Sequence, residues 1–136
     1  AIKKGNELAL YEYSLMHNKD SVWANYNSFT LQFIPDIYLY RGELLEKNLE
    51  FDAAYDTYVK GISTIETLEG DFAFSSVPII KQSYCGVVAA LYERIGDLYA
   101  NGLGSINVNH QIAKQYYEKA LLYFESTEVL DKINKL

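Results

Sequence analysis

The chain has 136 residues, a formal net charge of −6 and 49% hydrophobic residues, which is the composition of one globular domain. Its single cysteine excludes an internal disulfide. There is no run of 18 or more apolar residues, so no segment is predicted to span a bilayer. The negative charge argues against nucleic acids and anionic membrane surfaces as partners, and it favours a neutral or basic partner.

The first ten residues, AIKKGNELAL, contain no apolar core of the length found in signal peptides. We therefore expect a soluble protein, with the cytoplasm slightly favoured. A periplasmic or secreted location stays open if a signal peptide has been removed, because the sequence begins with Ala rather than Met. The sequence does not indicate the oligomeric state.

The amino-terminal third contains three predicted segments. Apolar residues recur at helical spacing over 2–18, which predicts a first helix. Residues 21–34 form a second, aromatic-rich segment whose pattern allows a helix or an extended chain. Pro35 then fits the first turn of a third helix, predicted over 36–48, where its missing N–H is not needed.

A fourth helix is predicted over 50–68, because its apolar residues follow one stripe. We expect Gly70 to end this helix and residues 68–78 to form a loop. The clearest helical period follows over 79–101, with Pro78 helping to start it.

The sequence GLGS at 102–105 is predicted to end that helix, because glycine accepts the left-handed geometry of a C-terminal cap. A sixth helix is predicted at about 109–125, and the polar tail 127–136 leaves room for a short last one. No alternating strand pattern bounded by turn residues occurs. The predicted fold class is therefore all-α.

The helices carry a repeated pattern around two glycines. Gly42 and Gly96 each have a tyrosine four residues before them and an apolar residue three residues after them. Each is followed by an Ala-aromatic-small triplet with the same internal spacing. The triplets are Ala54, Tyr58 and Gly61 in the first copy and Ala113, Tyr117 and Ala120 in the second. Small residues at these points would let two helices approach closely, with the aromatic rings filling the space beside them.

Residues 91–121 resemble a Sel-one-like repeat, the longer-looped relative of the tetratricopeptide repeat. The matching positions are Ile95, Gly96, Tyr99, Gly102, Gly104, Ala113, Tyr116, Tyr117, Lys119 and Ala120. The sequence departs from the family pattern at Asn109, which replaces an acid, at Ile112, which replaces a lysine, and by one inserted residue. Residues 38–62 resemble a plain tetratricopeptide repeat, although Arg41 stands where an apolar residue is usual.

The resemblance implies an α-solenoid of antiparallel helix pairs, with about six helices in a single domain over 1–136. In this arrangement 36–65 is a tetratricopeptide-like pair, 79–125 is a Sel-one-like pair, and 1–34 is a candidate capping pair. Each pair would bury its outer stripe against the next one.

Catalytic and cofactor motifs are not recognisable in the sequence. GLGS lacks the Gly-Lys-Ser/Thr ending of a phosphate loop and follows a predicted helix rather than a strand. The only two histidines, His17 and His110, have no partners at a tight metal-binding spacing. Cys85 lies among small and apolar residues, which favours a buried structural cysteine. We therefore expect no metal, no cofactor and no enzymatic activity.

The resemblance implies that the first helix of each pair lines a concave face that binds a protein or peptide. Helical phase places nine residues there, most of them acidic or polar, including Lys47 and Ala90. The residues predicted to bind the partner are Asp36, Leu39, Glu43, Glu46, Glu93, Asp97 and Asn101. An acidic groove would attract segments bearing Lys or Arg, and the alternative is that this face is only solvated.

The predicted function is therefore a non-catalytic protein–protein interaction module, such as an adaptor or regulator. One alternative is an inhibitor or immunity-type protein that neutralises a single basic partner, which would give one dominant and very tight complex. A fragment of a longer solenoid is also compatible and would expose apolar residues at one end. An enzyme is the least favoured class, because no constellation of catalytic residues is visible.

Overall fold

The computed structural model describes residues 34–71 and 78–136, and the part of the chain so described contains helices and no strands. The prediction of an all-α fold is confirmed for these residues. The helix predicted over 2–18 and all but the last residue of the segment 21–34 lie outside the described residues. The same is true of His17 and of most of the loop predicted at 68–78.

Within residues 34–71 and 78–136 five helices follow one another, and their bounds lie within a few residues of the predicted ones. They are α4 (Ile34–Lys47), α5 (Phe51–Asp71), α6 (Pro78–Asn101), α7 (His110–Tyr123) and α8 (Thr127–Asn134). The prediction that Gly70 ends the fourth helix is wrong, because α5 continues to Asp71. A glycine inside a helix costs only about 1 kcal/mol relative to alanine, so neighbouring helical residues can carry the helix through it.

The turns after α4 and α6 use the same backbone geometry. The backbone N–H of Glu50 donates to the carbonyl of Leu45 (2.8 Å), and that of Leu103 donates to the carbonyl of Leu98 (3.3 Å). Between donor and acceptor lies one left-handed residue, Leu49 with φ 64° in the first turn and Gly102 with φ 62° in the second. Both helices therefore end in a Schellman-type cap.

The start of α7 is set by Asn109. Its side chain accepts a hydrogen bond from the backbone N–H of Ile112 (3.0 Å), and its own backbone N–H donates to the carbonyl of Tyr99 (2.9 Å). Asparagine is among the preferred N-cap residues. This departure from the family pattern at 109 therefore still supplies a cap for the helix.

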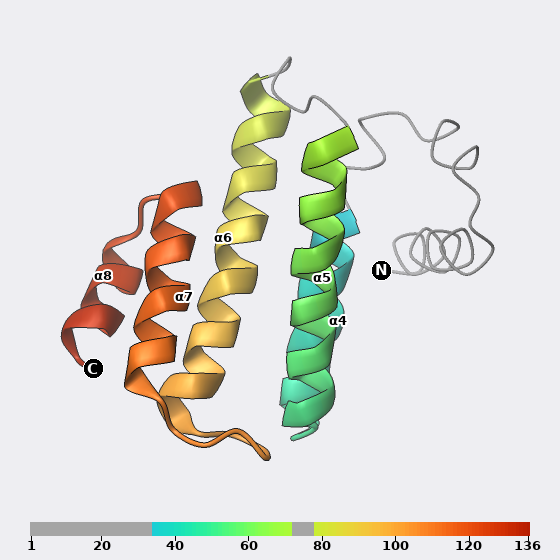
Figure 1. The fold of residues 1–136 in the computed structure, drawn as a ribbon. Helices are drawn as coiled ribbons and strands as arrows, with labels where there is room; N and C mark the ends of the chain where they lie inside the picture. The colour runs from blue at the N-terminus through green and yellow to red at the C-terminus, as the bar shows by residue number, and fades with distance from the viewer. Residues whose placement is uncertain (1–33, 72–77) are drawn as a thin grey trace.

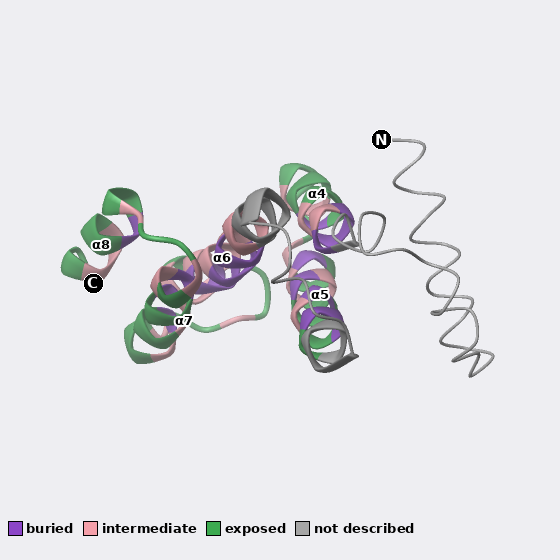
Figure 2. Ribbon diagram, turned by 90° about the horizontal axis from the view of Figure 1, so that it is seen from above, coloured by how far each residue is buried: buried purple, intermediate pink, exposed green. Residues whose placement is uncertain are grey.

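The helices lie side by side in chain order, with α4 and α5 together at one side of Figure 1 and α8 at the other. Contacts join α4 to α5, α5 to α6, α6 to α7 and α7 to α8. Seen from above, α4, α6 and α8 lie along one side of the molecule, and α5 and α7 lie along the other (Figure 2). We call the first side the even face.

Two glycine–tyrosine contacts hold the helices together. The ring of Tyr58 in α5 lies against Gly42 of α4, where an added Cβ would be 2.0 Å from the ring. The ring of Tyr117 in α7 lies against Gly96 of α6, where an added Cβ would be 2.7 Å away. Both tyrosines are buried. The glycines thus provide the space that the two rings occupy, as the sequence pattern predicts.

The loop between α6 and α7 is fastened to the first turn of α5. Asp52 Oδ1 accepts hydrogen bonds from the backbone N–H and from the hydroxyl of Ser105, both at 2.8 Å. These two bonds lower the pKa of the Asp52 carboxyl below its ordinary 3.8. Gly104 has φ 65°, and a Cβ there would be 2.5 Å from Asp52 Oδ1, so the contact requires glycine.

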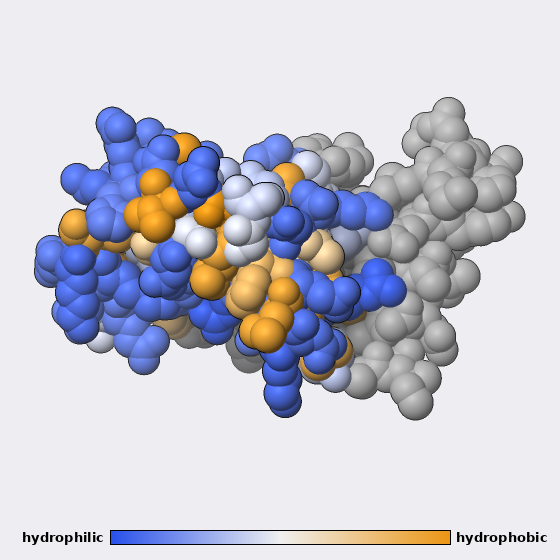
Figure 3. All heavy atoms as spheres, turned by 90° about the horizontal axis from the view of Figure 1, so that it is seen from below, coloured by the Kyte–Doolittle hydropathy of each residue, from blue (hydrophilic) through white to orange (hydrophobic). Residues whose placement is uncertain are grey.

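The lower end of the molecule exposes some apolar side chains. Leu49 is 75% exposed and Val108 is 57% exposed. Viewed from below, hydrophobic residues reach the surface in separate groups among hydrophilic ones (Figure 3). Scattered exposed apolar residues are usual on folded proteins, so these groups do not by themselves indicate an interface.

Candidate functional site

The predicted partner-binding residues lie on α4 and α6, but their surroundings differ. Leu39 is half-buried and packs against the core, so only part of it is accessible to a partner. Asp36 lies in the first turn of α4, and Asn101, the last residue of α6, is exposed. Asn101 donates from its side-chain amide to the backbone carbonyl of Asp97 (3.0 Å). The remaining four residues, Glu43, Glu46, Glu93 and Asp97, bond to other side chains of the protein.

Glu93 and Asp97, which we call the α6 carboxylate pair, lie one turn apart on the even face. Both bind the same ammonium group, that of Lys132 in α8. Lys132 Nζ donates to Glu93 Oε2 at 2.6 Å and to Asp97 Oδ1 and Oδ2 at 3.0 and 3.1 Å. The side chains of Glu93 and Asp97 are only 16% and 22% exposed. The pair is therefore a partly desolvated seat for one lysine.

The ammonium of Lys132 is stabilised in its charged form at this position. Burial alone would lower its pKa, but the hydrogen bonds to Glu93 and Asp97 outweigh burial, and the pKa is raised above 10.5. Hydrogen bonds between two charged groups are shorter and stronger than neutral ones. The contact of α8 with α6 is thus a charge-assisted one.

Arg94 forms a looser bridge from α6 to α4. Its guanidinium lies 3.8 Å from Glu43 Oε2 and 3.7 Å from Asp97 Oδ2. The side chains of Arg94 and Glu43 are 33% and 47% exposed, and exposed ion pairs contribute about 0–1 kcal/mol. Arg94 therefore adds a positive charge to the even face but binds Glu43 and Asp97 only weakly.

Two buried tyrosines donate hydrogen bonds to carboxylates among the predicted binding residues. The hydroxyl of Tyr117 donates to Asp97 Oδ1 at 2.6 Å, and that of Tyr58 donates to Glu46 Oε2. Burial, and then these hydrogen bonds, raise the pKa of both phenols above their ordinary 10.0. Asp97 is consequently held by a core hydroxyl on one side and by Lys132 on the other.

Sequence reasoning missed the cations of this site. Lys132 lies in the segment interpreted as a polar tail, although Val129, Ile133 and Leu136 give that tail a helical apolar spacing. Arg94 follows Glu93 directly and was not assigned to the predicted face. The even face is therefore less acidic than predicted, because Glu43, Glu93 and Asp97 share two cations from the chain itself.

A row of tyrosines joins α5, α6 and α7. Tyr55 of α5 and Tyr99 of α6 share a hydrogen bond between their hydroxyls (3.0 Å). Tyr99 stacks on Tyr116 of α7, with ring centroids 5.9 Å apart, and Tyr116 lies 6.3 Å from Tyr92. Lys119 Nζ lies 5.8 and 5.9 Å from the centroids of Tyr92 and Tyr116. Since these rings pack on one another, we interpret the row as internal packing.

Groups with catalytic or metal-binding potential are sparse in residues 34–71 and 78–136. No cluster of three or more His, Cys, Asp or Glu residues suited to a metal ion occurs there. His110 is exposed at the first position of α7. Cys85 was expected to be buried but is half-buried near the middle of α6. None of the helices in these residues is both long and apolar enough to cross a membrane.

Comparison of the chain with protein-family models, with curated proteins and with solved structures finds no match. The function is therefore inferred from the geometry of the chain itself.

Proposed function

We propose that the chain is a non-catalytic protein–protein interaction module whose partner, a basic protein or peptide, docks on the even face. The observation that carries this proposal is the α6 carboxylate pair. Two acidic side chains less than one quarter exposed converge on one ammonium group, at distances of 2.6–3.1 Å. Carboxylates in such a setting favour a cationic ligand over a neutral one.

The surroundings of the pair extend this preference across the face. Glu43 of α4 is half-exposed, and among the ion pairs of the described residues it contacts only the distant Arg94 guanidinium. A lysine or arginine of a partner could approach Glu43 without first displacing a strong bond. Charge pairs at the rim of an interface act mainly on association rate and partner choice.

The same proposal includes the finer architecture, in which α4 with α5 and α6 with α7 form antiparallel pairs stacked as a short α-solenoid. It is supported by the glycine–tyrosine contact that occurs once in each pair, at Gly42 and at Gly96. It is also supported by the matching caps after α4 and α6. In a solenoid, one row of helices presents a continuous surface for partners.

An affinity pull-down from lysate of the source organism tests the proposal. The bait is the wild-type chain beside a Glu43→Gln/Glu93→Gln variant, which removes two charges but keeps the size of both side chains. The matched control is Glu118→Gln, because Glu118 is exposed on α7 and its ion pair is with its neighbour Lys114 (3.9 Å).

We expect the wild type and the Glu118→Gln variant to retain the same protein, and the double variant to lose it. The captured protein should also dissociate as salt is raised, because charge pairing at an exposed face is screened. If the double variant retains the partner as well as the wild type does, the even face is not the docking surface. Retention of nothing by any bait would count against an interaction module.

A further inference from the structure

Helix α8 is held to the other described helices by few contacts. It has eight residues, and Val129 is its one buried residue. Ile133 and Leu136 are partly buried against the core. Its first turn is capped by Ser126, whose hydroxyl accepts from the backbone N–H of Val129 at 3.3 Å. A helix this short is unstable in isolation, so its folding depends on this small docking surface.

The strongest polar contact of α8 is made by Lys132. This residue places one ammonium group on the α6 carboxylate pair, 35 and 39 residues away in sequence. The side chain of Lys132 is 34% exposed, so the contact is accessible from solvent. The even face thus already holds a lysine, and this lysine belongs to a short helix.

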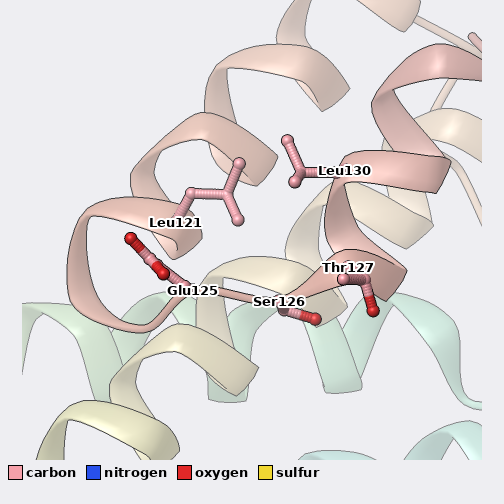
Figure 4. A pocket seen from close by; sticks show the side chains of 5 residues that line it. All are labelled: Leu121, Glu125, Ser126, Thr127 and Leu130. Carbon is pink, nitrogen blue, oxygen red and sulfur yellow. The ribbon is translucent and has the colours of Figure 1, made fainter.

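Grooves remain beside α8 where it packs on its neighbours. Leu121 of α7 and Leu130 of α8 point toward one another across a groove of about 580 Å³, with Glu125, Ser126 and Thr127 at its base (Figure 4). Leu130 remains 49% exposed. A second groove, of about 300 Å³, lies at the other end of α8 beside Asn101, His110 and Lys135. A helix of larger side chains would bury more surface here than α8 does.

We infer that α8 is a displaceable internal ligand, which covers the α6 carboxylate pair until a lysine-bearing amphipathic helix of the partner replaces it. This inference rests on the proposed function, since it names the partner and the regulation of the same face. The partner helix would carry apolar residues at the spacing of Val129, Ile133 and Leu136, with a lysine at the position of Lys132. Bulkier apolar side chains would let it exceed the affinity of α8.

The short connection of α8 to α7 explains how so small a helix can compete with a partner helix for the same surface. Phe124, Glu125 and Ser126 connect α8 directly to α7, so α8 is presented to its seat at an effective concentration in the millimolar range. A free helix must overcome this concentration, and its apparent affinity is its intrinsic affinity multiplied by the fraction of molecules in which α8 is open. A change that opens α8 should therefore strengthen binding of a competing helix.

Hydrogen exchange on the full chain measures the opening directly. We expect the backbone amides of α8 to exchange faster than those in the middle of α6, because short, sparsely packed elements open locally. The Lys132→Gln variant should accelerate exchange in α8 by about tenfold and leave the middle of α6 unchanged, since it removes hydrogen bonds between charged groups. Lys119→Gln on α7 is the control and should leave α8 unchanged.

Binding of a labelled peptide with the sequence of residues 126–136, followed by fluorescence anisotropy, then measures how accessible the surface beneath α8 is. The full-length Lys132→Gln variant should bind this peptide about tenfold more tightly than the wild type. The Glu93→Gln variant loosens α8 in the same way but damages the seat, so it should show faster exchange without tighter binding. A peptide whose counterpart of Lys132 is Gln should bind the Lys132→Gln variant at least about tenfold more weakly.

Equal peptide binding by the wild type and the Lys132→Gln variant would overturn the inference, as would equal binding of the two peptides. These outcomes are distinct from failure of the proposed function. A partner captured through Glu43 and Glu93, without any gain of peptide binding in Lys132→Gln, would show a docking face that α8 does not regulate. A gain of peptide binding with no captured partner would instead remove the proposed function and leave α8 as a displaceable helix.

Discussion

Alanine at three glycines should change stability in opposite directions, although each glycine lies inside a helix. At Gly42 an added Cβ would be 2.0 Å from the Tyr58 ring, and at Gly96 it would be 2.7 Å from the Tyr117 ring. At Gly86 in α6 it would meet no atom of the described residues within 4 Å. Gly86→Ala is therefore the matched control for the other two substitutions.

The magnitudes follow from these distances. At all three positions alanine gains roughly 1 kcal/mol over glycine. Tyr58 is fully buried and bonded to Glu46, so moving its ring aside costs roughly 1–3 kcal/mol of overpacking and about 1.5–3 kcal/mol of lost hydrogen bonding. We expect Gly42→Ala to lose about 2–4 kcal/mol of unfolding free energy, and Gly96→Ala to lose about 1–2 kcal/mol because its overlap is smaller. Gly86→Ala should gain about 0.5–1 kcal/mol.

Urea unfolding followed by far-ultraviolet circular dichroism gives the free energy of each variant. The expected order of stability is Gly86→Ala, wild type, Gly96→Ala, Gly42→Ala. The loss at Gly42 should shrink when Tyr58 is first replaced by leucine, because the two substitutions share one contact. A Gly42→Ala variant as stable as the wild type would refute the steric explanation. A Gly86→Ala variant destabilised as much as Gly42→Ala would refute it too.

Four further predictions follow, one on a turn, one on the loop junction and two on the core phenols. Leu49→Gly should raise the unfolding free energy by about 0.5–1 kcal/mol, because Leu49 has φ 64° and glycine adopts this geometry without strain; an unchanged urea midpoint would contradict this. Asp52→Ala should lower the unfolding free energy, because hydrogen bonds from Ser105 lower the pKa of Asp52 in the folded chain. The difference from the wild type should be full above pH 3.8 and should disappear as the pH falls below it. A difference that stays constant down to about pH 2 would argue against an ionised acceptor. Tyr117→Phe should cost about 1–2 kcal/mol, against little change for the exposed Tyr40→Phe. Because the folded pKa values of Tyr58 and Tyr117 are raised, stability should fall as pH rises above 10.0, where the unfolded chain ionises first; tyrosinate absorbance from both phenols before unfolding would contradict this.

The helices and their ends could be predicted from the chain because their signals are local. Apolar spacing located the helices from α4 to α7, and Gly102 marked the end of α6. The pairing of Gly42 with Tyr58 and of Gly96 with Tyr117 was also implied by the repeated spacing. Gly70 misled because a single glycine lowers helix stability by too little to end a helix whose neighbours favour it.

The charge pattern of the candidate site could not be predicted in the same way. Helical phase placed Glu43, Glu93 and Asp97 on one side, but it carried no information on which cations reach them. Lys132 arrives from a helix that follows two chain reversals, and Arg94 turns toward Glu43 only because α4 and α6 are neighbours.

Sequence periodicity specifies which residues share a helix face, because successive side chains are related by a fixed rotation of the same helix. The electrostatic character of the even face depends on distances of 2.6–3.8 Å between different helices. Those distances are set by how closely the helices pack, and that packing depends on the contacts of the Tyr58 ring with Gly42 and of the Tyr117 ring with Gly96. The sequence therefore indicated an acidic face, and the packing of α4, α6 and α8 converted it into a seat occupied by the chain's own lysine.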